Sequence, residues 1–144
     1  MAEENVNRVE ELSKKIFGEI NFKGQDIREY SPVVLAYLGD AVYELFIRTM
    51  VVSKGNAPVY KLHMDSVRYV KAKAQSDTIH NIMDRLTPEE QEIVRRGRNA
   101  KLNTVPKNAD IIEYKYSTGF ESLLGYLYLK QDYSRLTEIL KMCI

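Results

Sequence analysis

Apolar residues recur along this chain at intervals of three and four, the spacing that places side chains on one face of an α-helix. The first such series consists of Val6, Val9, Leu12 and Ile16, and the last consists of Tyr133, Leu136, Ile139 and Leu140. No segment shows convincingly the period of two that is typical of a β-strand, and the chain contains no repeat or low-complexity segment. The pattern predicts an all-α protein of six or seven helices.

A serine–proline pair marks the start of the longest predicted helix. Ser31 is suited to be an N-cap, and Pro32 fits the first turn because its missing N–H is not needed there. The apolar run that follows predicts a helix to about Ser53, with Gly55 just beyond its end. The polar connection NFKGQDIREY separates this helix from the first one.

Further helix boundaries follow from proline and from a capping pattern. Pro58 begins the next helical stretch. Thr87 and Glu90 have the spacing of a capping box, in which each side chain accepts a hydrogen bond from the other residue's backbone N–H. Residues 103–108 are predicted to form a loop, and helix resumes over residues 111–130.

The helix that begins at Pro32 is apolar on almost every side, yet it carries charged residues. Asp40, Glu44 and Arg48 follow one another at intervals of four and therefore lie on one stripe. Unpaired charges are costly to bury, so these groups need partners. One interpretation is a ladder of ion pairs along the helix surface. The other is a divalent cation held by carboxylates from more than one helix.

A second apolar helix pairs an acidic residue with a glycine in the same way. Glu121 lies one turn before Gly125, and Asp40 directly follows Gly39. Glycine inside a helix usually marks a close approach of two backbones. We therefore expect the two helices to cross at these glycines and to bring both carboxylates together. Oxygen ligands favour Mg²⁺ or Mn²⁺ over zinc, and such an ion suits phosphodiester chemistry.

Composition favours one globular domain covering residues 1–144. Apolar residues make up 44% of the chain and charged residues 28%, so a core can form without disulfides. Cys143 is the only cysteine, which favours a reducing compartment. No apolar run is long enough to span a membrane, and the charged first residues do not resemble a secretory signal.

The net charge of +1 names no partner, but the basic residues are grouped. Residues 95–108 contain five basic residues and no acidic one, and residues 61–73 form a second basic segment. Such segments are commonly solvated surface. The alternative is a face that binds a polyanion. The candidate contacts are Arg95, Arg96, Arg98, Asn99, Lys101 and Lys107 in the first group, and Arg68, Lys71 and Lys73 in the second.

Other polar residues do not suggest a site. His63 and His80 have no paired histidine or cysteine at metal-ligand spacing, which favours surface or capping roles. Ser117 and Thr118 have no histidine near them in sequence, so a serine-type nucleophile has no support. Cys143 lies beside the chain end and is expected to be inert.

The ordered motifs LAYLGDAVYELFIR, RGRNAK, PKN and YSTGFESLLGYLYL resemble the ribonuclease III family. Their order and spacing are most similar to mini-ribonuclease III, the short branch that consists of the catalytic domain. The resemblance covers the chain from about Ser31 onward. Residues 1–25 lie outside it and are interpreted as an extra N-terminal packing helix.

This resemblance implies roles for individual residues. Asp40 and Glu121 take the positions of two metal-binding carboxylates, with Glu44 a candidate third ligand. Tyr37 takes the place of an aromatic residue at the dimer interface. Ala36 and Thr118 stand where full-length ribonuclease III has a glutamate and an aspartate. Two of the four familiar carboxylates are therefore absent.

The resemblance also implies an activity. The expected enzyme is a homodimeric, Mg²⁺-dependent endoribonuclease, with Mn²⁺ as a substitute, in which a metal-activated water cleaves double-stranded RNA. The products would carry 5′-phosphates and 3′-hydroxyls on staggered ends. The implied substrate is the precursor of large-subunit (23S) ribosomal RNA in a bacterial cytoplasm. The missing carboxylates keep a non-catalytic RNA-binding or ribosome-associated protein open as an alternative, and a helical protein-interaction domain is a third.

Overall fold

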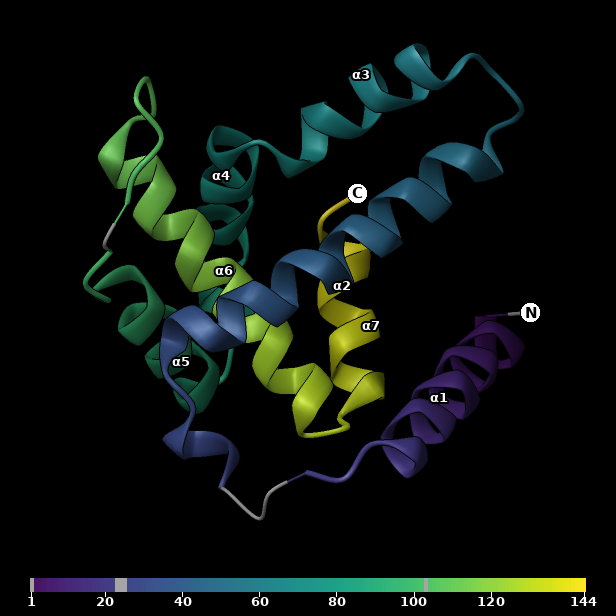
Figure 1. Ribbon diagram of the computed structural model, residues 1–144, viewed down its shortest axis with the longest axis horizontal. Helices are drawn as coiled ribbons and strands as arrows, with labels where there is room; N and C mark the ends of the chain where they lie inside the picture. Colours follow the sequence, from purple (N-terminus) through teal and green to yellow (C-terminus); the bar gives the residue numbers. More distant parts are fainter. Residues whose placement is uncertain (1, 23–25, 103) are drawn as a thin grey trace.

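The computed structural model describes residues 2–22, 26–102 and 104–144, with side chains from Glu10 onward. The predicted loop residue Asn103 and the side chains of Val6 and Val9 lie outside the described residues. Within the described ranges the chain forms helices and no strand, which confirms the all-α prediction (Figure 1). The α-helices are α1 (Ala2–Glu19), α2 (Pro32–Ser53), α3 (Val59–Val70), α4 (Ala72–Ile82), α5 (Pro88–Arg98), α6 (Ile111–Leu129) and α7 (Tyr133–Met142). Two short 3₁₀ turns are η1 (Ile27–Glu29) and η2 (Met83–Arg85).

The predicted caps are present at the helix ends. The Val34 N–H donates to Ser31 Oγ over 3.3 Å, and Pro32 occupies the first turn of α2. At the start of α5, Thr87 and Glu90 form the reciprocal capping box, with distances of 2.9 and 3.1 Å. Gly55 has φ +134°, a conformation that favours glycine, and it ends the turn after α2.

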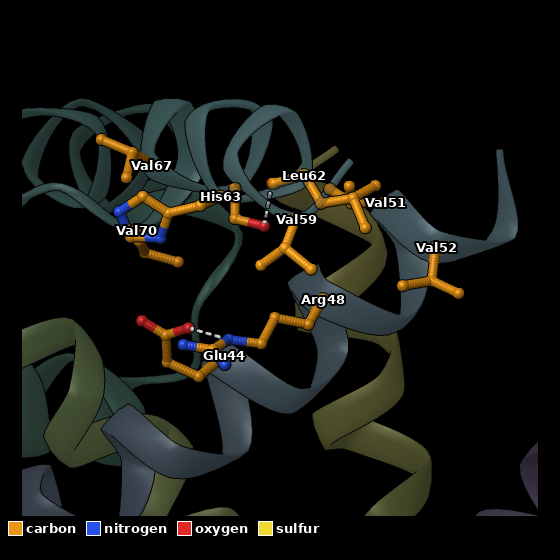
Figure 2. Close-up of a pocket in the computed structure, with 10 residues that line it drawn as sticks. Glu44, Arg48, Val51, Val52, Val59, Leu62, His63, Val67 and Val70 are labelled. Carbon is orange, nitrogen blue, oxygen red and sulfur yellow. Dashed lines mark hydrogen bonds and ion pairs between the residues drawn. The ribbon is translucent and has the colours of Figure 1, made fainter. Parts of the chain in front are cut away.

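The helical stretch that begins after Pro58 divides into two helices. Lys71 adopts an extended conformation, with ψ 151°, and separates α3 from α4. The Val70 carbonyl at this break accepts a hydrogen bond of 2.9 Å from Gln75 Nε2. α3 packs against the C-terminal part of α2 and leaves a groove of about 220 Å³ between them (Figure 2).

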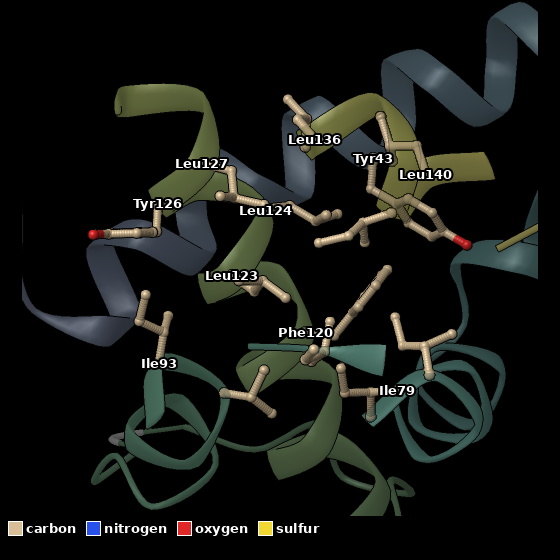
Figure 3. Close-up of a cluster of buried hydrophobic side chains, with 14 of the residues drawn as sticks. Tyr43, Ile79, Ile93, Phe120, Leu123, Leu124, Tyr126, Leu127, Leu136 and Leu140 are labelled. Carbon is tan, nitrogen blue, oxygen red and sulfur yellow. The ribbon is translucent and has the colours of Figure 1, made fainter. Parts of the chain in front are cut away.

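Helix α6 is the centre of the fold. Helix α2 crosses it, and α4, α5 and α7 pack around the remainder of its surface (Figure 1). Its Phe120, Leu123 and Leu124 are fully buried among side chains of the neighbouring helices (Figure 3). The Tyr43 ring of α2 meets the Phe120 ring edge-on, at a centroid distance of 5.1 Å. A helix that is apolar on nearly every side is expected at such a central position.

Helix α7 is fixed to the start of α5 by a buried ion pair. Arg135 Nε and Nη2 donate to the two carboxylate oxygens of Glu90, over 2.9 and 2.8 Å. Arg135 Nη2 also donates to the Arg85 carbonyl over 2.9 Å. Both charged groups are therefore satisfied although the Glu90 side chain is buried.

Helix α1 lies at the edge of the fold and contacts α7 (Figure 1). Phe17 is its main anchor, because its ring lies 5.3 Å from that of Tyr128 and 5.2 Å from that of Phe22. Leu12 and Ile16 of the predicted apolar series remain exposed. None of the helices described here combines the length and the apolar character needed to cross a membrane.

Candidate active site

The crossing of α2 and α6 is a direct contact between two backbones. A Cβ atom at Gly39 would lie 1.8 Å from the Glu121 carbonyl oxygen, and one at Gly125 would lie 1.9 Å from the Leu35 carbonyl oxygen. No side chain larger than hydrogen fits at either position. The crossing predicted from these glycines is therefore present. It places Asp40, the residue after Gly39, on the same side of the crossing as Glu121.

Burial and neighbouring charge perturb both carboxylates. Burial raises the pKa of Glu121 to about 8, with further increases from the charges of Asp40 and Glu44. The Gln75 side chain lowers the Glu121 pKa as a hydrogen-bonding partner. The pKa of Asp40 is also raised, first by loss of hydration and then by the charge of Glu44. Asp40, Glu44 and Glu121 thus form one site with excess negative charge.

Glu44 forms an ion pair with a residue of its own helix. Arg48 Nε donates to Glu44 Oε2 over 2.9 Å, at the edge of the groove between α2 and α3 (Figure 2). The ion-pair ladder considered for this stripe therefore exists between Glu44 and Arg48. Among the ion pairs of the described residues, none includes Asp40 or Glu121. Those two carboxylates are therefore available to bind a metal cation.

The donor set fits a hard divalent cation with a largely aqueous coordination shell. Within the described part of the chain, no three His, Cys, Asp or Glu side chains are arranged to enclose a metal ion. Mg²⁺ does not require such a cage, since it commonly binds through one or two carboxylates and retains several waters. A bound cation would also offset the burial and the negative charge of Asp40 and Glu44, which together raise the pKa of Glu121. These residues therefore suit Mg²⁺ or Mn²⁺.

The basic residues predicted at the end of α5 lie on the surface. Arg95 pairs with Glu92 one turn earlier, and the Arg98 guanidinium lies over the Tyr116 ring, 4.9 Å from its centroid. Arg95, Arg98 and Tyr116 line a cleft of about 340 Å³ beside α5. Asn99 occupies the C-cap of α5, where its backbone N–H donates to the Arg95 carbonyl. Asn99 therefore ends the helix, and its side chain is exposed.

The remaining basic candidates are also exposed. Lys101 and Lys107 lie in the connection between α5 and α6, while Arg68, Lys71 and Lys73 lie around the break between α3 and α4. Lys73 Nζ pairs with Asp77 Oδ2 over 3.2 Å. The candidates therefore form two groups. One lies at the break between α3 and α4, and the other lies at the C-terminal end of α5 and in the connection that follows it.

Exposed apolar residues run along one side of α2. Tyr37 is 83% exposed. Val34, Leu45 and Val52 are exposed on the same side of the helix, since the successive intervals of three, eight and seven residues are close to whole numbers of turns. Val33 is also exposed. An aromatic side chain so fully exposed is unusual in a monomeric protein.

The polar residues set aside in the sequence have local structural roles. The Cys143 thiol donates to the Ile139 carbonyl, and burial raises its pKa to about 12. Ser117 Oγ donates to the Tyr114 carbonyl over 2.7 Å. His80 Nδ1 donates to the Ser76 carbonyl over 2.7 Å. None of these groups is activated for nucleophilic chemistry.

Comparison with known proteins identifies the family. The Ribonuclease III domain matches residues 33–132, which include the whole α2–α6 crossing. The chain belongs to the ribonuclease III family. The family prediction is confirmed, and so is the prediction of an endoribonuclease. A ribonuclease III domain implies double-stranded RNA as the substrate.

Individual relatives cover most of the chain. Mini-ribonuclease 3 of a Thermoanaerobacter species is 52% identical over 120 residues, covering 83% of this chain and 84% of the relative. Mini-ribonuclease 3 of Clostridium tetani is 48% identical over 134 residues, covering 92% and 88%. A crystal structure of a protein from Fusobacterium nucleatum superposes with a TM-score of 0.74 at 34% identity, covering 82% of this chain and 94% of that protein.

The two departures from the full-length ribonuclease III pattern are occupied by buried residues. Ala36 faces the interior of the fold, and Thr118 Oγ1 donates to the Tyr114 carbonyl over 3.0 Å within α6. Neither position supplies a charge at the α2–α6 crossing. The negative charge there comes from Asp40 and Glu121, with Glu44 nearby.

The sequence analysis did not single out Gln75, which the fold places beside Glu121. The side chain is 1% exposed and shares one face of α4 with Ile79 and Ile82. Gln75 occupies a position in the α4 sequence where the helical spacing of Ile79 and Ile82 predicts an apolar residue. This departure could have indicated a site residue, because a buried amide needs hydrogen-bonding partners.

Proposed function

We propose that this ribonuclease III is a Mg²⁺-dependent enzyme that cleaves double-stranded RNA with Asp40 and Glu121 as its metal-binding carboxylates. The observation that carries the proposal is the backbone contact between α2 and α6. It holds these two carboxylates together in a partly buried site with no basic partner among the described residues. Enzymes of this family generally depend on a divalent metal.

In this mechanism the carboxylates bind and orient the cation at the crossing. When bound, Mg²⁺ or Mn²⁺ lowers the pKa of water and neutralises charge on the phosphate. Because the pKa of Glu121 is about 8 without a metal, Glu121 holds a proton at neutral pH and must release it for binding. Metal affinity should therefore increase as the pH rises toward 8. The expected products carry 5′-phosphates and 3′-hydroxyls on staggered ends.

RNA binding is assigned to the two exposed basic groups. A-form RNA is recognised mainly through its shape, phosphates and 2′-hydroxyls, which suits mobile surface cations. The proposed contacts are Arg95, Arg96, Arg98, Asn99, Lys101 and Lys107, together with Arg68, Lys71 and Lys73.

The salt dependence of binding tests this assignment. Each lost phosphate contact lowers the slope of log affinity against log salt by about one. Arg95→Ala combined with Arg98→Ala should lower it by about two, whereas Lys14→Ala with Lys15→Ala on α1 should leave it unchanged. A slope that is equal in both double variants excludes the α5 group from the RNA interface.

A homodimer is supported by the exposed apolar side of α2. Tyr37, Val34 and Leu45 would be buried if two copies met along this helix, and the two-fold axis would supply one catalytic site for each RNA strand. Tyr37→Glu should produce a monomer in sedimentation velocity, while Leu12→Glu on α1 should not. A dimer unaffected by Tyr37→Glu would place the interface elsewhere.

The finer assignments rest on the resemblance to mini-ribonuclease III. They are a ribosomal RNA precursor of the large subunit as the substrate, a cytoplasmic location, and an N-terminal helix that adds packing to the catalytic domain. Comparing cleavage of a 23S precursor duplex with that of a shuffled duplex of equal length tests the substrate assignment.

The decisive experiment is cleavage of a labelled RNA duplex by the wild type and by Asp40→Asn, in Mg²⁺ and in EDTA. Mg²⁺-dependent staggered cuts that Asp40→Asn abolishes, with its fold and dimer intact, are the expected result. The absence of carboxylates at Ala36 and Thr118 favours one other candidate, a non-catalytic RNA-binding relative. Binding of the 23S precursor duplex and of the shuffled duplex, without cleavage of either, would establish that candidate instead.

A further inference from the structure

Gln75 is a buried polar residue that the proposed mechanism does not yet use. Its side chain is 1% exposed and lies on the inner face of α4, which also carries Ile79 and Ile82. It is a hydrogen-bonding partner of Glu121 on α6. Packing alone would be satisfied by an apolar residue at this place in the series. The amide therefore needs another explanation.

The Gln75 amide lies between a backbone carbonyl and the Glu121 side chain. Its Nε2 donates to the Val70 carbonyl over 2.9 Å, at the break between α3 and α4. The amide also acts as a hydrogen-bonding partner of the Glu121 carboxylate. Gln75 thus connects the carboxylate to a fixed backbone carbonyl, which restricts the orientation of both.

The oxygen of the same amide is unsatisfied. Gln75 Oε1 is buried and has no hydrogen-bond partner among the described residues. It belongs to a side chain that is a hydrogen-bonding partner of Glu121, one of the two proposed metal-binding carboxylates. A water in the coordination shell of Mg²⁺ is a strong hydrogen-bond donor and suits such an acceptor.

Gln91 provides a comparison within the same chain. Its Nε2 donates to the Met83 carbonyl over 2.8 Å and to the Leu86 carbonyl over 3.4 Å. Both partners are backbone carbonyls, so this amide has a structural role in joining η2 to α5. Gln75 differs because its second partner is a carboxylate of the candidate active site.

We propose that Gln75 is a positioning residue for the cation: its amide N–H groups hold Glu121 in place, and its Oε1 accepts a hydrogen bond from a metal-bound water. This inference rests on the proposed cation site at Asp40 and Glu121. It adds a third helix, α4, to the elements that shape this site. Gln75 acts through Glu121 and through water, without contacting the metal itself.

The test measures metal binding in the absence of RNA, by Mn²⁺ electron paramagnetic resonance and by Mg²⁺ calorimetry. Replacing a residue that orients a metal ligand typically weakens metal binding 10- to 100-fold. We expect at least a tenfold loss of affinity for Gln75→Leu and for Gln75→Met, which retains an unbranched side chain if the leucine variant folds poorly. Gln91→Leu, the matched control, should change the affinity by less than about twofold.

A second readout follows Glu121 directly. In the metal-free protein, carboxyl titration by ¹³C NMR should show a higher Glu121 pKa in Gln75→Met than in the wild type, because the amide donor is gone. A packing defect without this contact would leave the titration unchanged.

The outcomes separate this inference from the function on which it rests. Wild-type metal affinity in both Gln75 variants, or an equal loss in Gln91→Leu, would overturn the role of Gln75. If Asp40→Asn loses metal binding in the same assay, the cation site stands in either case. If Asp40→Asn binds metal like the wild type, the proposed cation site fails, and the Gln75 assignment fails with it.

Discussion

Neutralising Glu121 should stabilise the metal-free protein while it removes catalysis. Glu121→Gln keeps the size of the side chain but removes a charge that burial and Asp40 disfavour. In the wild type, the pKa of this carboxyl is about 8 in the folded state and near its ordinary value of 4.5 in the unfolded state. The folded state therefore binds the proton more tightly, and the wild type loses stability as the pH rises between these two values.

The size of the effect follows from the same two pKa values. Below pH 4.5 both states hold the proton, and the variant gains almost nothing. Since each pKa unit corresponds to about 1.4 kcal/mol, the gain should be about 1 kcal/mol at pH 5, about 3 at pH 7 and about 5 at pH 9. Above pH 8 the carboxyl is ionised in both states, so the gain becomes constant.

Urea unfolding in EDTA at these three pH values measures the gain. Glu113→Gln, in the first turn of the same helix and only partly buried, is the control and should change stability by less than about 1 kcal/mol at every pH. Added Mg²⁺ should stabilise the wild type and leave Glu121→Gln unchanged. A gain that is equal at pH 5 and pH 9, or a loss at pH 9, would refute the raised pKa that burial and the Asp40 charge give Glu121 at the α2–α6 crossing.

Three further predictions concern packing and reactivity. Gly39→Ala should lower the free energy of unfolding by about 3 kcal/mol or more, because the added Cβ would overlap a carbonyl of α6. Gly18→Ala adds a Cβ in open space and should raise the free energy of unfolding by about 0.5–1 kcal/mol. Denaturant titration of both variants checks this. Arg135→Met should cost about 3–5 kcal/mol in the same measurement, since it leaves the buried Glu90 charge without its partner, and a loss below about 1 kcal/mol would contradict that. Cys143 should react with a thiol reagent at pH 8 only after unfolding, because its pKa is about 12, and rapid labelling of the native protein would disprove this.

Much of the secondary structure follows from short stretches of sequence. The Ser31 cap, the Thr87–Glu90 capping box and the turn at Gly55 each involve residues within four positions of one another. Such features depend on local hydrogen bonds and on backbone conformation, which neighbouring residues determine. The break at Lys71 was not predicted, because it depends on how α3 and α4 pack rather than on a proline or glycine in the chain.

The sequence by itself determined most of the helix boundaries, the two glycines at which α2 and α6 meet, and the family motifs that contain Asp40 and Glu121. Only the tertiary structure decided that Glu44 pairs with Arg48 and that Gln75 lies beside Glu121. The tertiary structure likewise fixed the pairing of Arg135 with Glu90, 45 positions earlier. Charges and amides can pair with many distant partners, and the packing of the helices selects among them. A glycine crossing has a simpler cause, because only a missing Cβ lets two backbones touch.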